Sequence, residues 1–224
     1  WAAGIWQSEQ IFIYAMNPET GEVRWTNDTS GGIYMAQPHG GANAKSGVSA
    51  QGYLLANDNH LFVPTGRAVP AAFARATGKF EYYRLQENTR RGGTSAMLAG
   101  SLLYNGGYTY ATQDGSLLPD KITGVVAAFA DGIIHGSGNE LRALKSVMKE
   151  AKDRKGNTIM VPAHETLWQV KDVPSGTALI VAGNTVVCSN GEQIAAVSLD
   201  SQTIIWSDEV DDVGFGQRAT HGRH

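Results

Sequence analysis

Short apolar stretches separated by polar turns repeat along most of this chain of 224 residues. The stretches are rich in Val, Ile, Leu, Ala and aromatic residues, and Gly, Asn, Asp and Pro stand between them. This alternation is typical of β-strands joined by tight turns. The stretches form groups of about four, and a new group begins roughly every 40 residues, which predicts an all-β array of four-stranded antiparallel sheets.

The strand groups define the expected organisation of the chain. About five groups are visible, at positions 2–27, 52–85, 95–112, 124–170 and 178–208. The first group lacks one strand, and the third is expected to end in a loop through Asp114-Gly115 and Pro119-Asp120. The repeat array is expected to span 1–213, and 214–224 is expected to form a polar tail or the start of a further sheet. Because the chain starts at Trp1 inside an expected strand, we expect it to be a piece of a longer protein.

A charged insertion at about 146–162 interrupts the fourth group. Leu141, Leu144, Met148 and Ala151 recur there at helical spacing, so a short amphipathic helix is expected around 146–154. Its Lys and Arg residues are expected to form a solvated face, since charge runs of this kind are usually exposed to water.

A long, polar, Gly-rich connection follows the first group, and its part at 31–52 is the best candidate for a binding loop. Basic residues of this connection and of later loops could bind an anion or an acidic surface through charge-assisted hydrogen bonds. These candidate binding residues are His39, Lys45, Arg67, Arg90 and Arg91. The alternatives left open are a Gly-rich cover for the connection and a solvated loop for the arginines.

Composition narrows the possible functions. The net charge is −3, so no broad basic field predicts a nucleic-acid partner. The single cysteine, Cys188, excludes an internal disulfide and a zinc site built on several thiolates. No histidines are spaced as in a helical zinc site, and no apolar run approaches the roughly 20 residues of a membrane span.

One strand–turn–strand pattern occurs twice clearly and a third time in weakened form. Tyr14–Trp25 and Ala72–Tyr82 each place a Thr-Gly pair in the turn and an aromatic residue four positions after the Gly. Ala196–Trp206 keeps the spacing from Ala to Trp but has lost the Gly. One such unit cannot bury its own apolar face, so the pattern predicts sheets that stack against one another.

The run Ala-(Leu or Met)-(Asp or Asn)-x-x-Thr-Gly-x-x-x-Trp resembles the repeat of β-propellers of the pyrroloquinoline-quinone (PQQ) type. Quinoprotein dehydrogenases carry this repeat, and so do outer-membrane assembly factors that hold no quinone. The resemblance implies four-stranded blades that form part of a seven- or eight-bladed ring. By position it implies turns at Thr20-Gly21 and Thr77-Gly78, and aromatic packing between blades for Trp25, Tyr82, Trp168 and Trp206.

The resemblance implies a binding or scaffold module that meets a protein partner or a small ligand at one propeller face. No cofactor, metal ion or catalysis is expected of this chain itself, and the remaining blades or other domains of a longer chain are expected as neighbours. The resemblance to secreted and periplasmic relatives favours an extracytoplasmic location, although the sequence does not fix the compartment.

The alternative is a fragment of a quinoprotein-type oxidoreductase that depends on PQQ and calcium. Such an enzyme needs a stacked Trp floor, an ion held by carboxylate and amide oxygens, a catalytic Asp and commonly a vicinal Cys pair. The single cysteine rules out the pair, and no Asp-x-Asp cation loop is present.

Overall fold

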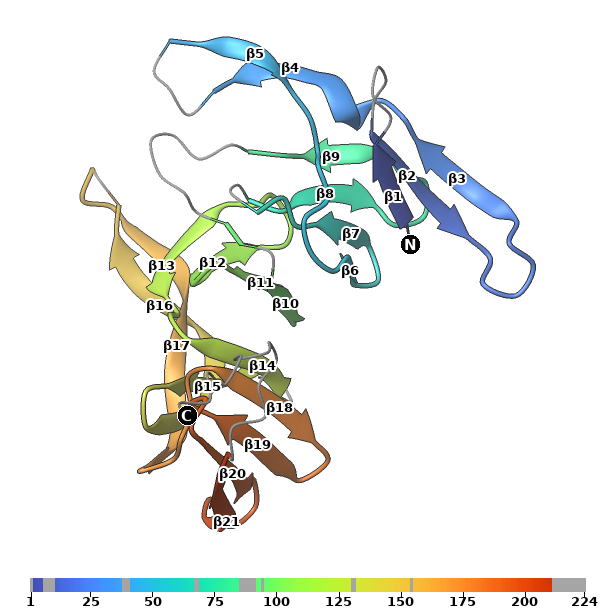
Figure 1. The fold of residues 1–224 in the computed structure, drawn as a ribbon. Coiled ribbons are helices and arrows are strands. Elements are labelled where there is room, and N and C mark those ends of the chain that lie inside the picture. Colours follow the sequence, from blue (N-terminus) through green and yellow to red (C-terminus); the bar gives the residue numbers. More distant parts are fainter. Residues whose placement is uncertain are drawn as a thin grey trace, which may run out of the picture. The chain divides into compact units, whose positions relative to one another are not determined.

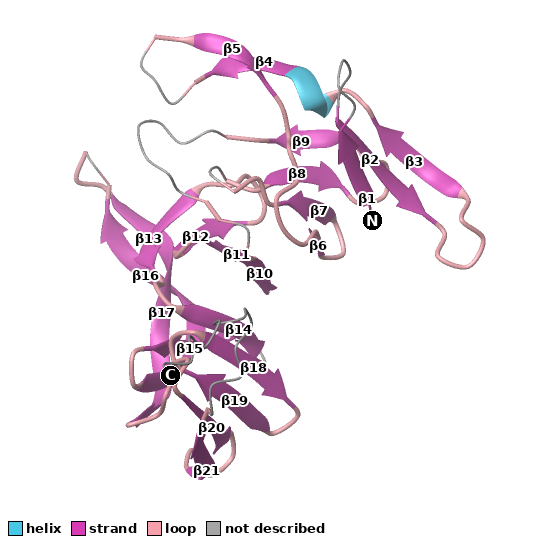
Figure 2. Ribbon diagram, in the orientation of Figure 1, coloured by secondary structure: helices cyan, strands magenta, loops and turns pink. Residues whose placement is uncertain are grey.

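The computed structural model consists almost entirely of antiparallel β-sheet (Figure 1). The structure describes residues 2–5, 11–37, 41–66, 69–84, 92–93, 95–129, 132–153 and 155–210. Within them, the helical segment is the short 3-10 turn η1 at Ser30–Gly32 (Figure 2). None of the helical structure in these ranges has the length and apolar character to span a membrane. The predicted class, all-β with four-stranded antiparallel sheets, is confirmed.

The chain divides into two compact units. The first unit comprises 1–123, 130–133 and 145–165, and the second comprises 124–129, 134–144 and 166–224. The first unit holds a three-stranded sheet with β1 (Ala2–Ile5), β2 (Ile11–Met16) and β3 (Val23–Asn27), followed by a hairpin of β4 (Ile33–Ala36) and β5 (Asn43–Ser46). Its second sheet has β6 (Leu55–Ala56), β7 (His60–Val63), β8 (Ala71–Ala74) and β9 (Phe80–Tyr82). Its third has β10 (Ala96–Ala99), β11 (Leu102–Asn105), β12 (Tyr108–Ala111) and β13 (Leu117–Lys121).

Two further sheets complete the described chain. The fourth has β14 (Val125–Phe129), β15 (Gly132–Ser137), β16 (Glu140–Lys152) and β17 (Thr158–Lys171). The base of its long β16–β17 hairpin belongs to the second unit, and the part at 145–165 belongs to the first. The fifth sheet, in the second unit, has β18 (Ala178–Ala182), β19 (Thr185–Ser189), β20 (Gln193–Ser198) and β21 (Ile204–Glu209).

The turn before the last strand has one geometry in four of the sheets. In each case a residue with positive φ donates its backbone N–H to the carbonyl oxygen four positions earlier. These bonds run from Gly21 to Asn17 (2.8 Å, φ 73°), Gly78 to Ala74 (2.8 Å, φ 71°), Gly115 to Ala111 (3.0 Å, φ 69°) and Gln202 to Ser198 (3.0 Å, φ 57°). Glycine adopts this conformation at little cost, whereas Gln202 adopts it against the clash of its own Cβ.

A β-bulge follows three of these turns at the same place. Ala15 lies opposite Trp25, Ala72 opposite Tyr82 and Ala196 opposite Trp206, and the register shifts beside each pair. A bulge bends the strand and redirects its side chains. The turn and the bulge together therefore place an aromatic ring at an equivalent position of three sheets.

Trp25 joins the first sheet to the second. Its indole Nε1 donates a hydrogen bond to the carbonyl oxygen of Arg75 at 3.0 Å, and its ring lies where a Cβ on Gly78 would stand. Asn27, which is buried, donates from Nδ2 to the carbonyl oxygen of Gly78 at 2.8 Å. Only a glycine at position 78 leaves room for this approach, because any side chain would overlap the indole.

Tyr82 joins the second sheet to the third in the same manner. Its hydroxyl donates to the carbonyl oxygen of Thr112 at 2.9 Å, and its ring lies 2.6 Å from the place of a Cβ on Gly115. In the third sheet the position four residues after this glycine holds Pro119. That sheet therefore lacks the aromatic residue that the first two sheets carry.

The aromatic residues of the fourth and fifth sheets differ in burial. Trp168 is partly buried and packs against the hydrophobic cluster of the second unit. Trp206 is 45% exposed. Ile180 lies on the same face of the fifth sheet, because Ile180, Val187, Ala196 and Trp206 are successive cross-strand neighbours, and it is 64% exposed. The packing of Trp206 against a neighbouring sheet stays a prediction.

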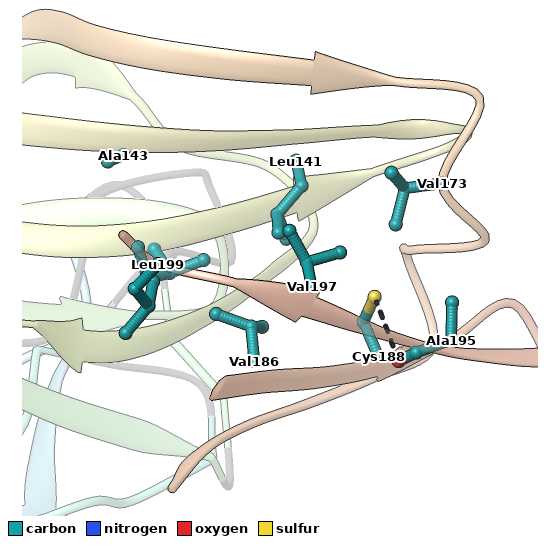
Figure 3. Close-up of a cluster of buried hydrophobic side chains, with 9 residues drawn as sticks. Leu141, Ala143, Val173, Val186, Cys188, Ala195, Val197 and Leu199 are labelled. Atoms are coloured by element: carbon teal, nitrogen blue, oxygen red, sulfur yellow. Dashed lines mark hydrogen bonds between the residues drawn. The ribbon is translucent and has the colours of Figure 1, made fainter. Parts of the chain in front are cut away.

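Three hydrophobic clusters fill the spaces between neighbouring sheets. Ile13 of β2 meets Leu61 and Phe73 in the first cluster, and Phe62 meets Tyr110 in the second. The third cluster, in the second unit, joins the fourth and fifth sheets (Figure 3). Its buried residues are Ile134, Leu141, Ala143, Val173, Val186, Cys188, Ala195, Val197 and Leu199. In β7 the apolar residues alternate between two clusters, with Leu61 and Val63 in the first and Phe62 in the second, as stacking on both sides of a sheet requires.

Two expectations from the sequence need correction. The short helix expected over 146–154 is wrong, because β16 continues as one strand and Met148, at 56% exposure, belongs to no buried helical stripe. Pairing with β17 overrides the brief helical spacing. The third strand group also has a fourth strand, β13, where a loop was expected. Pro119 within β13 weakens the strand pattern there.

Candidate functional site

The β4–β5 hairpin lies within the connection expected to bind a partner. The segment at 31–52 is a two-stranded ribbon followed by extended chain, and not a Gly-rich loop throughout. The ribbon stands between the first and second sheets in chain order and pairs with no further strand among those described. It is thus a departure from the structural repeat, and such departures are where repeat proteins commonly carry binding residues.

The base of this hairpin is closed by close contact between two glycines. A Cβ on Gly47 would overlap the carbonyl group of Gly31, so no other residue fits at position 47 without moving the backbone. The N–H of Val48 donates to the carbonyl oxygen of Ser30 at 3.1 Å. The hydroxyl of Ser30 in turn donates to Oδ1 of Asn27 at 2.7 Å, which ties the hairpin to the first sheet.

One face of the ribbon is fully exposed. Tyr34 and Lys45 lie directly opposite each other, and Ala36 pairs with Asn43 on the same face. All four side chains are exposed, and Tyr34 has 69% of its surface open to solvent. An exposed tyrosine beside a lysine offers an aromatic surface with a hydrogen-bonding tip and a mobile positive charge.

The far end of the ribbon is held by Gln37. Its side-chain Nε2 donates to the carbonyl oxygens of Met35 at 3.1 Å and Ala44 at 3.3 Å. The bond to Ala44 links the two strands across the end that leads to the connecting turn. The ribbon therefore presents Tyr34 on a backbone fixed at both ends.

The structure places one of the predicted binding residues, Lys45, on this exposed face. The other four candidates, His39, Arg67, Arg90 and Arg91, lie outside the described residues. Tyr53, which no sequence pattern singles out, is 88% exposed shortly after the hairpin. A lone aromatic residue between Gly and Leu carries no periodic signal, so only the structure reveals its exposure.

Elsewhere in the first unit, two histidines make specific contacts. The Tyr104 hydroxyl lies 2.8 Å from Nε2 of His164. His60 Nε2 lies 3.0 Å from a carboxylate oxygen of Glu81. Both pairs join strands within the fold. A structural role therefore accounts for these contacts without catalysis.

The sulfur of Cys188 is buried in the cluster of the second unit and lies 3.8 Å from the carbonyl oxygen of Ala195 (Figure 3). Burial raises the pKa of this thiol to about 11, so little thiolate is present at neutral pH. In the ranges that the structure describes, no three His, Cys, Asp or Glu side chains gather closely enough to hold a metal ion. The expectations about cofactors and metal ions stay predictions.

Comparison with known proteins identifies the class of β-fold. No protein-family model and no curated protein matches this chain. Its structure is similar to that of BamB from Moraxella catarrhalis, with a TM-score of 0.54 and 10% identity over 93% of this chain and 61% of that one. The chain has a β-propeller fold. It is also similar to the computationally designed Ika8 protein, with a TM-score of 0.50 and 16% identity over 89% of this chain and 55% of Ika8.

The chain therefore spans 61% and 55% of the lengths of these two proteins. Its five larger sheets are blades, and the Trp25 and Tyr82 contacts join neighbouring blades. At sequence identities of 10% and 16%, these similarities show the fold and not the function. Membership of the PQQ-like repeat family and the total number of blades stay predictions.

Proposed function

We propose that this chain is a protein-binding propeller module without catalysis of its own. The turns, bulges and aromatic contacts of the repeat are engaged in holding blades together. The residues available to a partner are therefore those of the segments that depart from the repeat. Similarity to BamB supports a scaffold of this kind.

The exposed face of the β4–β5 hairpin is the observation that carries the proposal. Tyr34 and Lys45 are paired across the two strands on a ribbon whose base and far end are both hydrogen-bonded. A preorganised tyrosine loses little conformational entropy on binding, and tyrosine is enriched among residues that dominate interface energies. The neighbouring lysine favours a partner surface that is acidic.

The partner is expected to be a protein whose surface has an apolar recess that receives Tyr34 and a carboxylate that pairs with Lys45. The basic residues His39, Arg67, Arg90 and Arg91 add to the same preference for an acidic partner if they share this side of the propeller. Long-range attraction of this type speeds association and weakens with salt.

Site-specific photo-crosslinking tests the proposal. A photoreactive phenylalanine analogue replaces Tyr34 in one sample and Ile180, which is equally open to solvent in the second unit, in a control sample. A partner captured from position 34 and not from position 180 supports the proposal. Its affinity, measured with purified components, should then fall at least tenfold in a Tyr34→Ser, Lys45→Glu variant. Equal capture from both positions, or an unchanged affinity, would show that another surface binds.

A further inference from the structure

The fourth blade contains a hairpin that extends well beyond its sheet. β16 has 13 residues and β17 has 14, whereas their neighbour β15 has six (Figure 1). The hairpin ends in a turn where the N–H of Gly156 donates to the carbonyl oxygen of Asp153 at 3.0 Å. The part beyond the sheet therefore forms a two-stranded arm, defined here as residues 146–163.

Along one edge of this arm, the part of the chain that the structure describes supplies no hydrogen-bonded strand. In the described sheet order β16 is paired only with β15 and β17. Because the two-residue turn Gly138-Asn139 joins β15 to β16, the six residues of β15 are long enough to reach along β16 only about as far as Lys145. From Ser146 onward, no described strand of this sheet is therefore long enough to pair with that side of β16, and unpaired N–H and C=O groups along a strand edge can accept a further strand.

The opposite edge of the arm is less suited to pairing. Pro162 lies in β17 and has no backbone N–H, so it removes a donor from the strand. Proline is tolerated in an edge strand where it faces away from the paired neighbour. β16 carries no proline between Ser146 and Lys152. The β16 edge is accordingly the one that could accept a strand along its whole length.

The arm exposes both apolar and basic side chains. Met148, Ile159 and Met160 are 56%, 42% and 54% exposed. The arm and its root also carry exposed lysines at positions 145, 149, 152 and 155. The acidic side chains from 145 to 160 are Glu150 and Asp153, so the arm is locally positive in a chain whose net charge is −3.

The one carboxylate at the tip is already engaged. Asp153 accepts hydrogen bonds from the backbone N–H of Lys155 and of Asn157, both at 2.8 Å, and from Asn157 Nδ2 at 2.9 Å. These bonds fix the turn and lower the pKa of the Asp153 carboxyl. The lysines therefore have few carboxylates nearby with which to pair.

The arm is anchored at its root. Tyr104, which is 3% exposed, meets His164 with its hydroxyl 2.8 Å from Nε2 and the ring centres 5.7 Å apart. Lys149 Nζ donates to the carbonyl oxygen of His164 across the two strands at 3.4 Å. An isolated two-stranded ribbon is marginally stable in water, and a third strand with an apolar face would stabilise it.

We propose that the β16 edge of this arm, from Ser146 to Lys152, binds an extended acidic segment of another protein as an added β-strand. Main-chain hydrogen bonds to β16 would supply affinity, and the exposed lysines and methionines would select a segment in which acidic and apolar residues alternate. This surface is distinct from the Tyr34–Lys45 face, so either proposal can fail while the other holds.

Binding of a defined peptide to the full chain tests the proposal. The probe is a capped peptide of alternating Glu and Val residues, and its matched control has methyl groups on alternate backbone nitrogens. Fluorescence anisotropy measures affinity, and amide hydrogen exchange locates the site. We expect the probe to bind, to slow exchange within 146–152, and to lose at least tenfold in affinity when its backbone is methylated.

Charge reversal tests the role of the lysines. A Lys149→Glu, Lys152→Glu variant should bind the acidic peptide about tenfold more weakly, while a Lys171→Glu control at the other end of β17 should bind it normally. Failure of the probe to bind, equal binding of the methylated peptide, or protection outside 146–152 would overturn the proposal. Self-association through the arm, or binding to vesicles of anionic lipid in place of the peptide, would also count against it.

Discussion

The indole ring of Trp25 covers Gly78 in the turn of the next blade, and its Nε1 is hydrogen-bonded to that turn at the Arg75 carbonyl oxygen. The contact needs both partners. The ring supplies apolar area and one donor, and the glycine supplies a surface without a Cβ. Tyr82 and Gly115 repeat the arrangement one blade later. The aromatic residue and the turn glycine thus act as two halves of one joint between blades.

A methyl group on Gly78 should break this joint, and Gly21 provides a matched control. Both glycines have φ near 70°, so Gly→Ala at either position costs about 1–2 kcal/mol in backbone strain. At Gly78 the added Cβ would also overlap the Trp25 ring, while at Gly21 nothing lies within 4 Å. Gly78→Ala should therefore lower the free energy of unfolding by about 1–3 kcal/mol more than Gly21→Ala does. Urea denaturation measures both, and equal losses would mean that the ring does not confine position 78.

Two tryptophans that face alanines in the same register should differ in their contribution to stability. Trp25 is bonded to the next blade, and Trp206 is 45% exposed. Trp25→Ala should cost about 2–4 kcal/mol, because it removes both the packing and the hydrogen bond. Trp206→Ala should cost less than about 1 kcal/mol. Thermal and urea unfolding of the two variants measure this difference, and a larger loss for Trp206 would contradict the structure.

The turn of the fifth blade offers a stabilising change. Gln202 has a φ of 57°, in a turn where the first three blades have glycine. Gln202→Gly should raise the free energy of unfolding by about 0.5–1 kcal/mol, because relief of backbone strain exceeds the entropy that glycine adds to the unfolded chain. Gln202→Ala keeps the strain and should leave stability within about 0.5 kcal/mol of the parent. A loss of stability in the glycine variant would show that the Gln202 side chain has a role of its own.

Alkaline pH should weaken the second joint. Burial, with the nearby Asp114 charge as a smaller cause, raises the pKa of the Tyr82 phenol above its usual value of 10.0. Below pH 10 the phenol is neutral in both states, so its contribution is fully present. Above pH 10 it ionises in the unfolded chain first, and the free energy of unfolding falls as the pH rises through the folded pKa.

Tyr82→Phe isolates this effect. At pH 8 the variant should be about 0.5–1.5 kcal/mol less stable than the parent, because the hydrogen bond to the Thr112 carbonyl oxygen is lost. The gap should narrow between pH 10 and pH 11, since only the parent has a phenol that titrates at this site. Urea titrations at several pH values measure the gap, and a constant gap would mean that Tyr82 is not desolvated.

The sequence was most informative about the repeat. The spacing of Gly and aromatic residues was sufficient to predict antiparallel four-stranded sheets, because the turn and the strand period are local properties. It could not show which glycine each ring would cover, since Trp25 and Gly78 belong to different blades. It also missed the strand β13 that follows Gly115, because Pro119 stands where the first two blades have an aromatic residue.

The candidate binding surfaces were harder to predict. The connection at 31–52 was identified from its length and glycine content, but the pairing of Tyr34 with Lys45 depends on a hairpin register that composition does not specify. The arm of β16 and β17 was expected to be partly helical. Its few apolar residues fit a helical spacing as well as a strand, and long-range pairing decided between them.

A double-mutant cycle on Trp25 and Gly78 tests the joint between blades most directly. Gly78→Ala is measured in the parent and in a Trp25→Ala background, with unfolding free energies from urea titration. If the ring confines position 78, the added Cβ should cost about 1–3 kcal/mol less once the indole is removed, giving a coupling of that size. Additive effects, with a coupling near zero, would show that Trp25 and Gly78 do not act together and would contradict this account of how the blades are held.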